Sequence, residues 1–308
     1  MKSEGLCSIR NARSFGWVFT FMLLSFVLMV QKSPAAGPIT IYVVNYPLQY
    51  FAERIGGDQV KVVFPAPAGV DPAYWQPNLA DISAYQKADL ILLNGAGYAK
   101  WVRKVSLPRS KMVNTSRQFK DRYITRKEVM THSHGAEGKH AHEALAFTTW
   151  LDLELAASQA EAITLAICRK RPELKEVFQR NYESLKEDLL ALDRKIQAIV
   201  SQEPSIPLIA SHPVYDYFAR RYGLNMVSVH WEPDETPTPK QWRGLKRIRK
   251  THPAEWMIWE GEPMKATVEY LESIGIRTRV FDPCGNVPEK GDFLTRMRQN
   301  VENLLAIW

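Results

Sequence analysis

Four of the seven histidines lie in one short stretch of the chain, residues 131–143, at positions His132, His134, His140 and His142. The stretch is polar and contains glycine, which is typical of a loop. Imidazoles two residues apart in a loop can wrap a borderline metal ion such as Zn²⁺. The pattern therefore indicates an accessory metal-binding loop, and the alternative is a solvated polar loop that happens to be rich in histidine.

Motifs of common enzymes and of cysteine-based metal sites are absent from the sequence. The chain has no HExxH, no GxSxG and no phosphate-cradling glycine loop, so we do not expect an enzyme. It has three cysteines and no CxxC pair, which excludes a disulfide-stapled scaffold and a structural zinc motif. Cys168 and Cys284 could pair in an oxidising compartment or stay free.

Composition and charge describe an ordinary globular protein. The 308 residues are 45% hydrophobic and 24% charged, enough to bury one or two sizeable cores. The formal net charge is +7, but four Lys or Arg against one Glu in the first 36 residues account for three of those charges. The remaining excess is spread along the chain, so no nucleic-acid partner is expected.

Residues 1–36 have the order of a secretory signal peptide. Arg10 and Arg13 precede an uncharged apolar segment, residues 14–31, and small residues follow up to Ala36. We expect cleavage near Ala36 and a periplasmic or otherwise extracytoplasmic mature chain. An uncleaved anchor is the alternative, because about 18 uncharged residues can just span a bilayer.

Short β-like runs alternate with amphipathic stretches in two regions of the chain. The runs are residues 39–44, 60–64, 90–94 and 112–114, then 208–211, 226–230, 255–259 and 277–281. This alternation predicts mostly parallel sheets flanked by helices. The fold class is therefore α/β, with an N-terminal lobe at 37–171 and a C-terminal lobe at 204–308.

Between these regions, residues 172–203 predict one long helix. The segment has no glycine or proline after Pro172, and its apolar residues recur at helical spacing. About 30 helical residues extend some 45 Å, the length of a domain. We interpret this helix as a strut that joins the lobes; the alternative is a helix packed on one lobe.

Six motifs along the mature chain occur in the order seen in the zinc/manganese substrate-binding proteins of ABC transporters. The chain resembles that family over essentially its whole mature length. The motifs lie at residues 69–82, 87–97, 150–152, 211–224, 259–260 and 281–283, with the histidine-rich stretch in the expected place. The resemblance implies two lobes, a rigid helix and one metal ion in the cleft. A histidine-rich loop also marks the zinc-type members, which favours Zn²⁺ over Mn²⁺, with copper as a further alternative. The implied partners are a permease and an ATPase, and we expect a monomer.

The family's four metal ligands carry over only in part. The two positions that match the histidines of the N-terminal lobe are Ala73 and Thr148, neither of which is a good zinc ligand. The other two positions are His212 and Asp282. Two donors seldom hold Zn²⁺ tightly, so either other side chains complete the shell or the cleft holds something else.

Several side chains near the family motifs could complete the shell: Asp71, Glu260, Glu262, His230 and Cys284. Glu260 matches an acidic residue that usually supports the family's site from behind the ligands. A thiolate at Cys284 would suit a soft ion, but a small buried residue is the alternative. His230 could point into the cleft or be a hydrogen-bonded core residue, and the loop histidines could fold in.

Aromatic residues accompany the two altered positions. Tyr74 and Trp75 follow Ala73, and Trp150 follows Thr148. They could simply pack the lobes, or they could line a wider cleft that accepts a metal chelate or an organic ligand. A surface attachment protein on the same scaffold is a further alternative, whereas a metalloenzyme is not expected.

Overall fold

The computed structural model of the protein describes residues 37–126 and 144–308. Residues Gly37–Trp308 form one compact unit. The expected signal peptide and the accessory histidines His132, His134, His140 and His142 lie outside the described residues.

The first sheet contains four parallel strands, in the order β2-β1-β3-β4. These are β1 (Ile39–Val43), β2 (Val60–Val63), β3 (Leu90–Leu93) and β4 (Met112–Asn114). In β1, Ile39, Ile41 and Val43 are buried and alternate with less buried residues. Strands β2 and β3 flank β1 on opposite sides, so the chain reverses its winding direction at β1. Open α/β sheets bind ligands at such a switch point.

The second sheet repeats this design, with four parallel strands in the order β10-β9-β7-β8. Its strands are β7 (Pro207–Ala210), β8 (Asn225–Ser228), β9 (Trp256–Trp259) and β10 (Arg277–Val280). All four residues of β9 are buried, as expected of a central strand covered on both faces.

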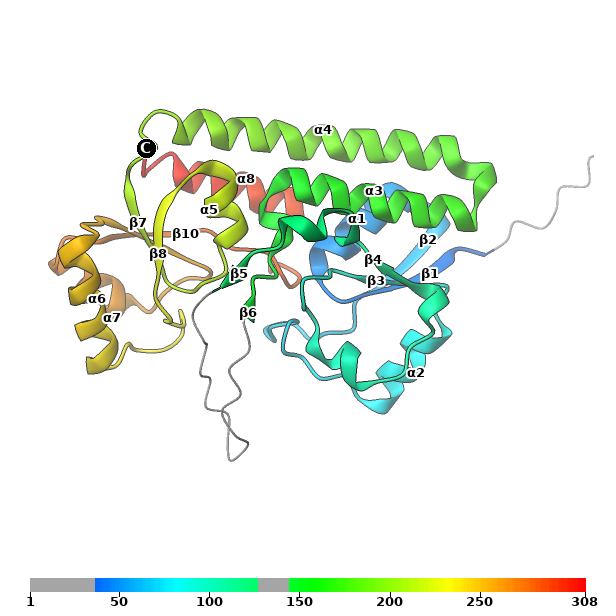
Figure 1. The fold of residues 1–308 in the computed structure, drawn as a ribbon, viewed down its shortest axis with the longest axis horizontal. Coiled ribbons are helices and arrows are strands. Elements are labelled where there is room, and N and C mark those ends of the chain that lie inside the picture. The colour runs from blue at the N-terminus through cyan, green and yellow to red at the C-terminus, as the bar shows by residue number, and fades with distance from the viewer. Residues whose placement is uncertain (1–36, 127–143) are drawn as a thin grey trace, which may run out of the picture. The chain divides into compact units, whose positions relative to one another are not determined.

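Helices flank both sheets (Figure 1). They are α1 (Tyr46–Gly56), α2 (Leu79–Lys87), α3 (Leu153–Lys170), α4 (Lys175–Val200), α5 (Asp216–Tyr222), α6 (Pro239–Thr251), α7 (Lys265–Ser273) and α8 (Phe293–Leu304). Short 3₁₀ turns complete the connections, including η5 (Thr149–Leu151) and η6 (Pro172–Leu174). Helix α4 lies along α3 and α1 at one end and along α8 and α5 at the other (Figure 1).

The long helix therefore contacts helices that accompany both sheets. Its buried positions Tyr182, Leu185, Leu189 and Leu192 recur at helical spacing and join the main core. That core is continuous, since it also includes Ile41 of the first sheet and residues of the second. The lobe boundaries at 171 and 203 stay a prediction.

A two-stranded antiparallel hairpin, β5 (Thr125–Arg126) with β6 (Ala144–Leu145), was not expected from the sequence. Each strand has only two residues, too few for an alternating pattern to show. Arg126 anchors the hairpin to the second half of the chain, because its guanidinium pairs with Asp216 of α5.

The predicted fold class is confirmed: each expected strand is present to within two residues, and both sheets are parallel. Cys168 and Cys284 are free thiols. Within the described ranges, no helix is both long enough and apolar enough to cross a membrane.

Candidate metal centre

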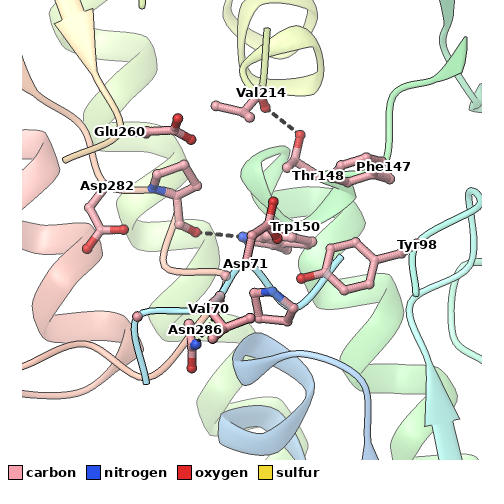
Figure 2. A pocket seen from close by; sticks show the side chains of 14 residues that line it. Val70, Asp71, Tyr98, Phe147, Thr148, Trp150, Val214, Glu260, Asp282 and Asn286 are labelled. Carbon is pink, nitrogen blue, oxygen red and sulfur yellow. Dashed lines mark hydrogen bonds between the residues drawn. The ribbon is translucent and has the colours of Figure 1, made fainter. Parts of the chain in front are cut away.

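A cavity of about 250 Å³ opens where loops from the two sheets meet. Figure 2 shows its side chains, with Glu260 and Asp282 on one side, Tyr98 and Phe147 on the other, and Asp71 between them. The lining residues are Gly69, Val70, Asp71, Pro72, Tyr98, Phe147, Thr148, Trp150, Val214, Glu260, Asp282, Pro283, Gly285 and Asn286.

Hydrogen bonds across the cavity connect the two halves of the chain. The Thr148 hydroxyl donates to the Val214 carbonyl, and the Trp150 indole N–H donates to the Pro283 carbonyl over 2.7 Å (Figure 2). The Asn286 amide donates to the carbonyls of Pro67 and Val70, both at 2.8 Å. The cavity is therefore bounded by direct contacts between the loops of both sheets.

A buried polar network positions the loop that carries Thr148 and Trp150. Asn94, just after β3, donates to the Phe147 carbonyl over 2.8 Å. Its side-chain oxygen accepts hydrogen bonds from Thr149 and from Gln159 of α3, at 3.3 and 3.1 Å. Because these polar groups are buried and paired with one another, the loop is held in one conformation.

Donor side chains follow each strand of the second sheet at its carboxyl end. His212 follows β7, Glu232 follows β8, Glu260 follows β9 and Asp282 follows β10. Backbone hydrogen bonds continue the strand pairing beyond β7 and β8, from Val229 to Ala210 and from Trp231 to Ser211, both at 2.8 Å. This pairing brings the residues after the two strands side by side.

His212, Glu232 and Glu260 form a cluster whose potential ligand atoms all lie within 4.8 Å of one another. His212 Nδ1 is 3.4 Å from a Glu232 carboxylate oxygen and 3.6 Å from a Glu260 oxygen. The His212 and Glu260 side chains are largely buried, at 20% and 25% exposure, whereas that of Glu232 is 47% exposed. One imidazole and two carboxylates are a donor set that suits a divalent metal ion.

His230, the second histidine predicted for this region, lies at the margin of the cluster. Its ring centroid is 5.6 Å from that of His212, and the residue is exposed. Its backbone carbonyl accepts a hydrogen bond from Gln241 of α6. His230 therefore neighbours the cluster without belonging to the set of mutually close donors.

Asp282 lines the cavity, but its carboxylate already has protein partners. One oxygen accepts the Cys284 backbone N–H at 2.7 Å, and the other lies 3.3 Å from Arg296 of α8. Cys284 itself is 1% exposed, belongs to the main core and does not line the cavity. Burial raises the pKa of its thiol, so a thiolate is disfavoured there.

Burial raises the pKa values of four carboxyl groups in this region. Burial, and then the charges of Glu232, Asp71 and Asp282, raise the pKa of Glu260 to about 8. Burial also raises the pKa values of Asp71, Glu232 and Asp282. A bound cation would favour the charged forms of these carboxyl groups, which burial disfavours.

Burial and charge repulsion at Glu260 predict a pH-dependent stability of the metal-free protein. The pKa of Glu260 is higher in the folded chain than its ordinary value of 4.5, so the folded state holds the extra proton between pH 4.5 and about 8. The free energy of unfolding should therefore fall as pH rises through this window, by a few kcal/mol at most. Urea unfolding of chelator-treated protein at pH 5, 6.5 and 8 measures this fall.

The matched variant is Glu260→Gln, which mimics the protonated side chain. The free energy of unfolding of this variant should equal that of the unmodified protein at pH 5 and exceed it at pH 8. Glu269→Gln, a change of an exposed glutamate on α7, serves as the control and should leave the pH profile as it was. If the free energy of unfolding falls with pH equally in Glu260→Gln and in the unmodified protein, Glu260 does not cause the fall.

The family model of the periplasmic zinc-uptake complex component A, ZnuA, matches residues 41–307. The chain belongs to this family. Among relatives of the ZnuA family, the high-affinity zinc uptake system protein ZnuA of Bacillus subtilis is 27% identical, over 84% of this chain and 84% of its own length. The zinc-binding lipoprotein AdcA of Streptococcus pneumoniae is 26% identical over 91% of this chain. The alignment spans 58% of that AdcA, so this chain corresponds to little more than half of it.

Solved structures confirm the ZnuA-like fold. The metal-dependent lipoprotein YcdH of Bacillus subtilis superposes with a TM-score of 0.73 at 23% identity, covering 87% of this chain and 98% of that one. Zn(II)-bound AdcA of Streptococcus pneumoniae gives the same TM-score at 21% identity, covering 88% of this chain and 57% of its own.

Ala73 and Thr148, the two positions that match histidines of the family, offer no donor to the cavity, in line with the expectation from the sequence. Ala73 is 2% exposed and lies in the main core, with its N–H donating to Asp71 at 2.8 Å. Thr148 lines the cavity, but its hydroxyl is engaged by Val214. The cluster of donors in this chain is instead contributed by the loops of the second sheet.

Sequence analysis missed Glu232 and the cavity-lining roles of Tyr98 and Phe147. Glu232 comes two residues after His230, so a carboxylate at a strand end was visible in the sequence and could have been weighed. Nothing in the sequence around Tyr98 or Phe147 distinguishes a cavity wall from ordinary core packing.

Proposed function

We propose that the protein captures Zn²⁺ outside the cytoplasm through His212, Glu232 and Glu260. The observation that carries this proposal is the convergence of one imidazole and two carboxylates within 4.8 Å, on three neighbouring strand ends. Membership of the zinc-uptake family supports the choice of ion. Three protein donors leave a fourth tetrahedral position open to water or to a further carboxylate, and Asp71 and Asp282 line the cavity together with Glu260.

The donor chemistry supports Zn²⁺ over copper. A mixed nitrogen and oxygen set is ordinary for zinc and acceptable to Mn²⁺, whereas Cu(I) prefers thiolate or thioether sulfur. Cys284 is the only cysteine near the cavity in the described part of the chain, and its thiol is buried in the core. Manganese is therefore the competitor against which zinc selectivity is tested.

The protein then passes the ion to a membrane permease driven by an ATPase. Support comes from membership of the zinc-uptake family and from the absence of any need for a chemical step at the cluster. A monomer is the simplest form for this role, since every proposed ligand comes from one chain. The N-terminal segment 1–36 would direct export, and the mature chain would work in the periplasm or an equivalent compartment.

Deleting residues 131–143 tests whether the cluster is sufficient for zinc binding. The deletion should leave one Zn²⁺ per chain at the affinity of the full protein, because all three proposed ligands remain. Only weaker, additional binding by the histidine-rich loop should disappear. Titration of chelator-treated protein with Zn²⁺ against a competing chelator measures the tight and the weak zinc binding. The same titration with Mn²⁺ measures selectivity. Loss of all tight binding on deletion would relocate the site to the loop.

A further inference from the structure

The cavity beside the metal cluster is larger than a bare ion requires. Its volume of about 250 Å³ compares with roughly 30 Å³ for one water molecule in the liquid. Of the three clustered donors, only Glu260 lines it. The rest of the cavity therefore extends away from the proposed zinc ligands and offers space for a small molecule.

One side of the cavity is a rigid aromatic wall. The Tyr98 ring packs edge-on against Phe147 and Trp150, with centroid distances of 5.3 and 5.7 Å. Tyr98 and Trp150 are 8% and 1% exposed, and the indole is fixed by its hydrogen bond to Pro283. Such a wall binds apolar groups by packing and cations through the faces of its rings.

The other side of the cavity is acidic. Asp71, Glu260 and Asp282 all line it, and the described residues that line it include no Lys, Arg or His. Two cationic side chains lie close to the lining without belonging to it: Lys100 stands over the Tyr74 ring at 4.6 Å, and Arg296 lies 3.3 Å from Asp282. A cationic nitrogen would meet carboxyl oxygens from Asp71, Asp282 and Glu260, whereas an anionic group would meet the same acceptors without a lining cation from the described residues to pair with.

We propose that this cavity, from Asp71 and Asp282 to Tyr98, Phe147 and Trp150, binds a small organic cation. The ligand class is an ammonium or guanidinium ion that carries an alkyl or aromatic group. Its nitrogen lies against the carboxylates and its apolar part packs on the aromatic wall. The inference goes beyond zinc capture, because it requires neither a bound metal nor His212.

Calorimetry on chelator-treated protein tests the proposal with three probes: phenethylammonium, choline and agmatine. At least one should bind with a Kd of about 1 mM or better. The matched neutral and anionic probes, 2-phenylethanol and phenylacetate, should bind at least tenfold more weakly than phenethylammonium if that cation is the one that binds. Binding of no cation above the level of 2-phenylethanol overturns the proposal.

Two variants locate the binding. Asp71→Asn removes one charge and should weaken the cation at least tenfold. Gly285→Val fills the cavity, because a Cβ at Gly285 would lie 3.6 Å from the Trp150 ring and 3.8 Å from the Tyr98 hydroxyl, in ordinary contact with both. Unchanged binding in both variants, with melting temperatures showing that they fold, would place the ligand elsewhere and overturn the proposal.

His212→Ala separates this inference from zinc capture. The variant should lose zinc and keep the organic cation, since His212 does not line the cavity. Loss of cation binding in folded His212→Ala would contradict a separate cation site. Failure of zinc binding in the unmodified protein, with cation binding intact, would refute only the zinc proposal.

Discussion

His212→Ala should weaken zinc binding at least about 100-fold, or some 2.7 kcal/mol. His212 is the only imidazole in the donor cluster, and its Nδ1 faces both carboxylates at 3.4 and 3.6 Å. Alanine removes a donor that the remaining carboxylates cannot replace, because two ligands do not offset dehydration of the ion. The affinity is measured by competition with a chelator of known strength.

His252→Gln is the matched control for this variant. His252 belongs to the same half of the chain, but its ring contacts the Leu208 backbone carbonyl at 2.9 Å and does not face the cavity. Its replacement should leave zinc affinity within about threefold. Equal affinity in His212→Ala and the unmodified protein would remove His212 from the site.

The two glutamates extend the test. Glu260→Gln should cost more affinity than Glu232→Gln, because the Glu232 side chain is 47% exposed and water can take its place. Both should bind zinc more weakly than the Glu269→Gln control. A larger loss from Glu232 than from Glu260 would contradict this ranking.

Asp193→Ala should lower the free energy of unfolding by about 3 to 5 kcal/mol. Asp193 lies on α4 with 3% exposure and accepts hydrogen bonds from the Arg221 guanidinium at 2.9 and 2.5 Å. It also accepts the Tyr222 hydroxyl at 2.9 Å. Alanine would leave the guanidinium and the hydroxyl at the junction of α4 and α5 without this acceptor. Urea unfolding of the metal-free protein measures the loss.

Lys195→Ala on the same helix is the control for Asp193→Ala. Its ammonium pairs with Glu302 at 2.6 Å, but both side chains are about half exposed. An exposed pair contributes about 1 kcal/mol or less, because solvent screens it. Similar losses in the two variants would contradict the view that the buried Asp193 network holds α5 against α4.

Periodicity was sufficient to predict most of the fold. The helices α3 and α4 show apolar residues at helical spacing, and the eight strands of the two sheets were found as short apolar runs that alternate with amphipathic stretches. Register and sheet order do not follow from such spacing, because they depend on contacts far apart in the chain. The hairpin β5–β6 was missed for the different reason that its strands are two residues long.

The site was only partly predictable. His212 and Glu260 were expected near the cleft and belong to the cluster, yet the role of every predicted ligand stays a prediction until a metal is located. Cys284 shows why neighbours in sequence mislead: it lies two residues after Asp282, but its backbone turns through a φ of 57° and its side chain lies in the core. The Arg296 partner of Asp282 comes from α8, which no local pattern could reveal.

The most direct test of zinc capture by the second-sheet loops is an anomalous-difference map from crystals of the zinc-loaded protein, collected on both sides of the zinc absorption edge. The account predicts one strong peak within about 2.3 Å of His212 nitrogen and of oxygens from Glu232 and Glu260. A peak beside Thr148 with none at His212, or zinc held only by the histidines of residues 131–143, would contradict it.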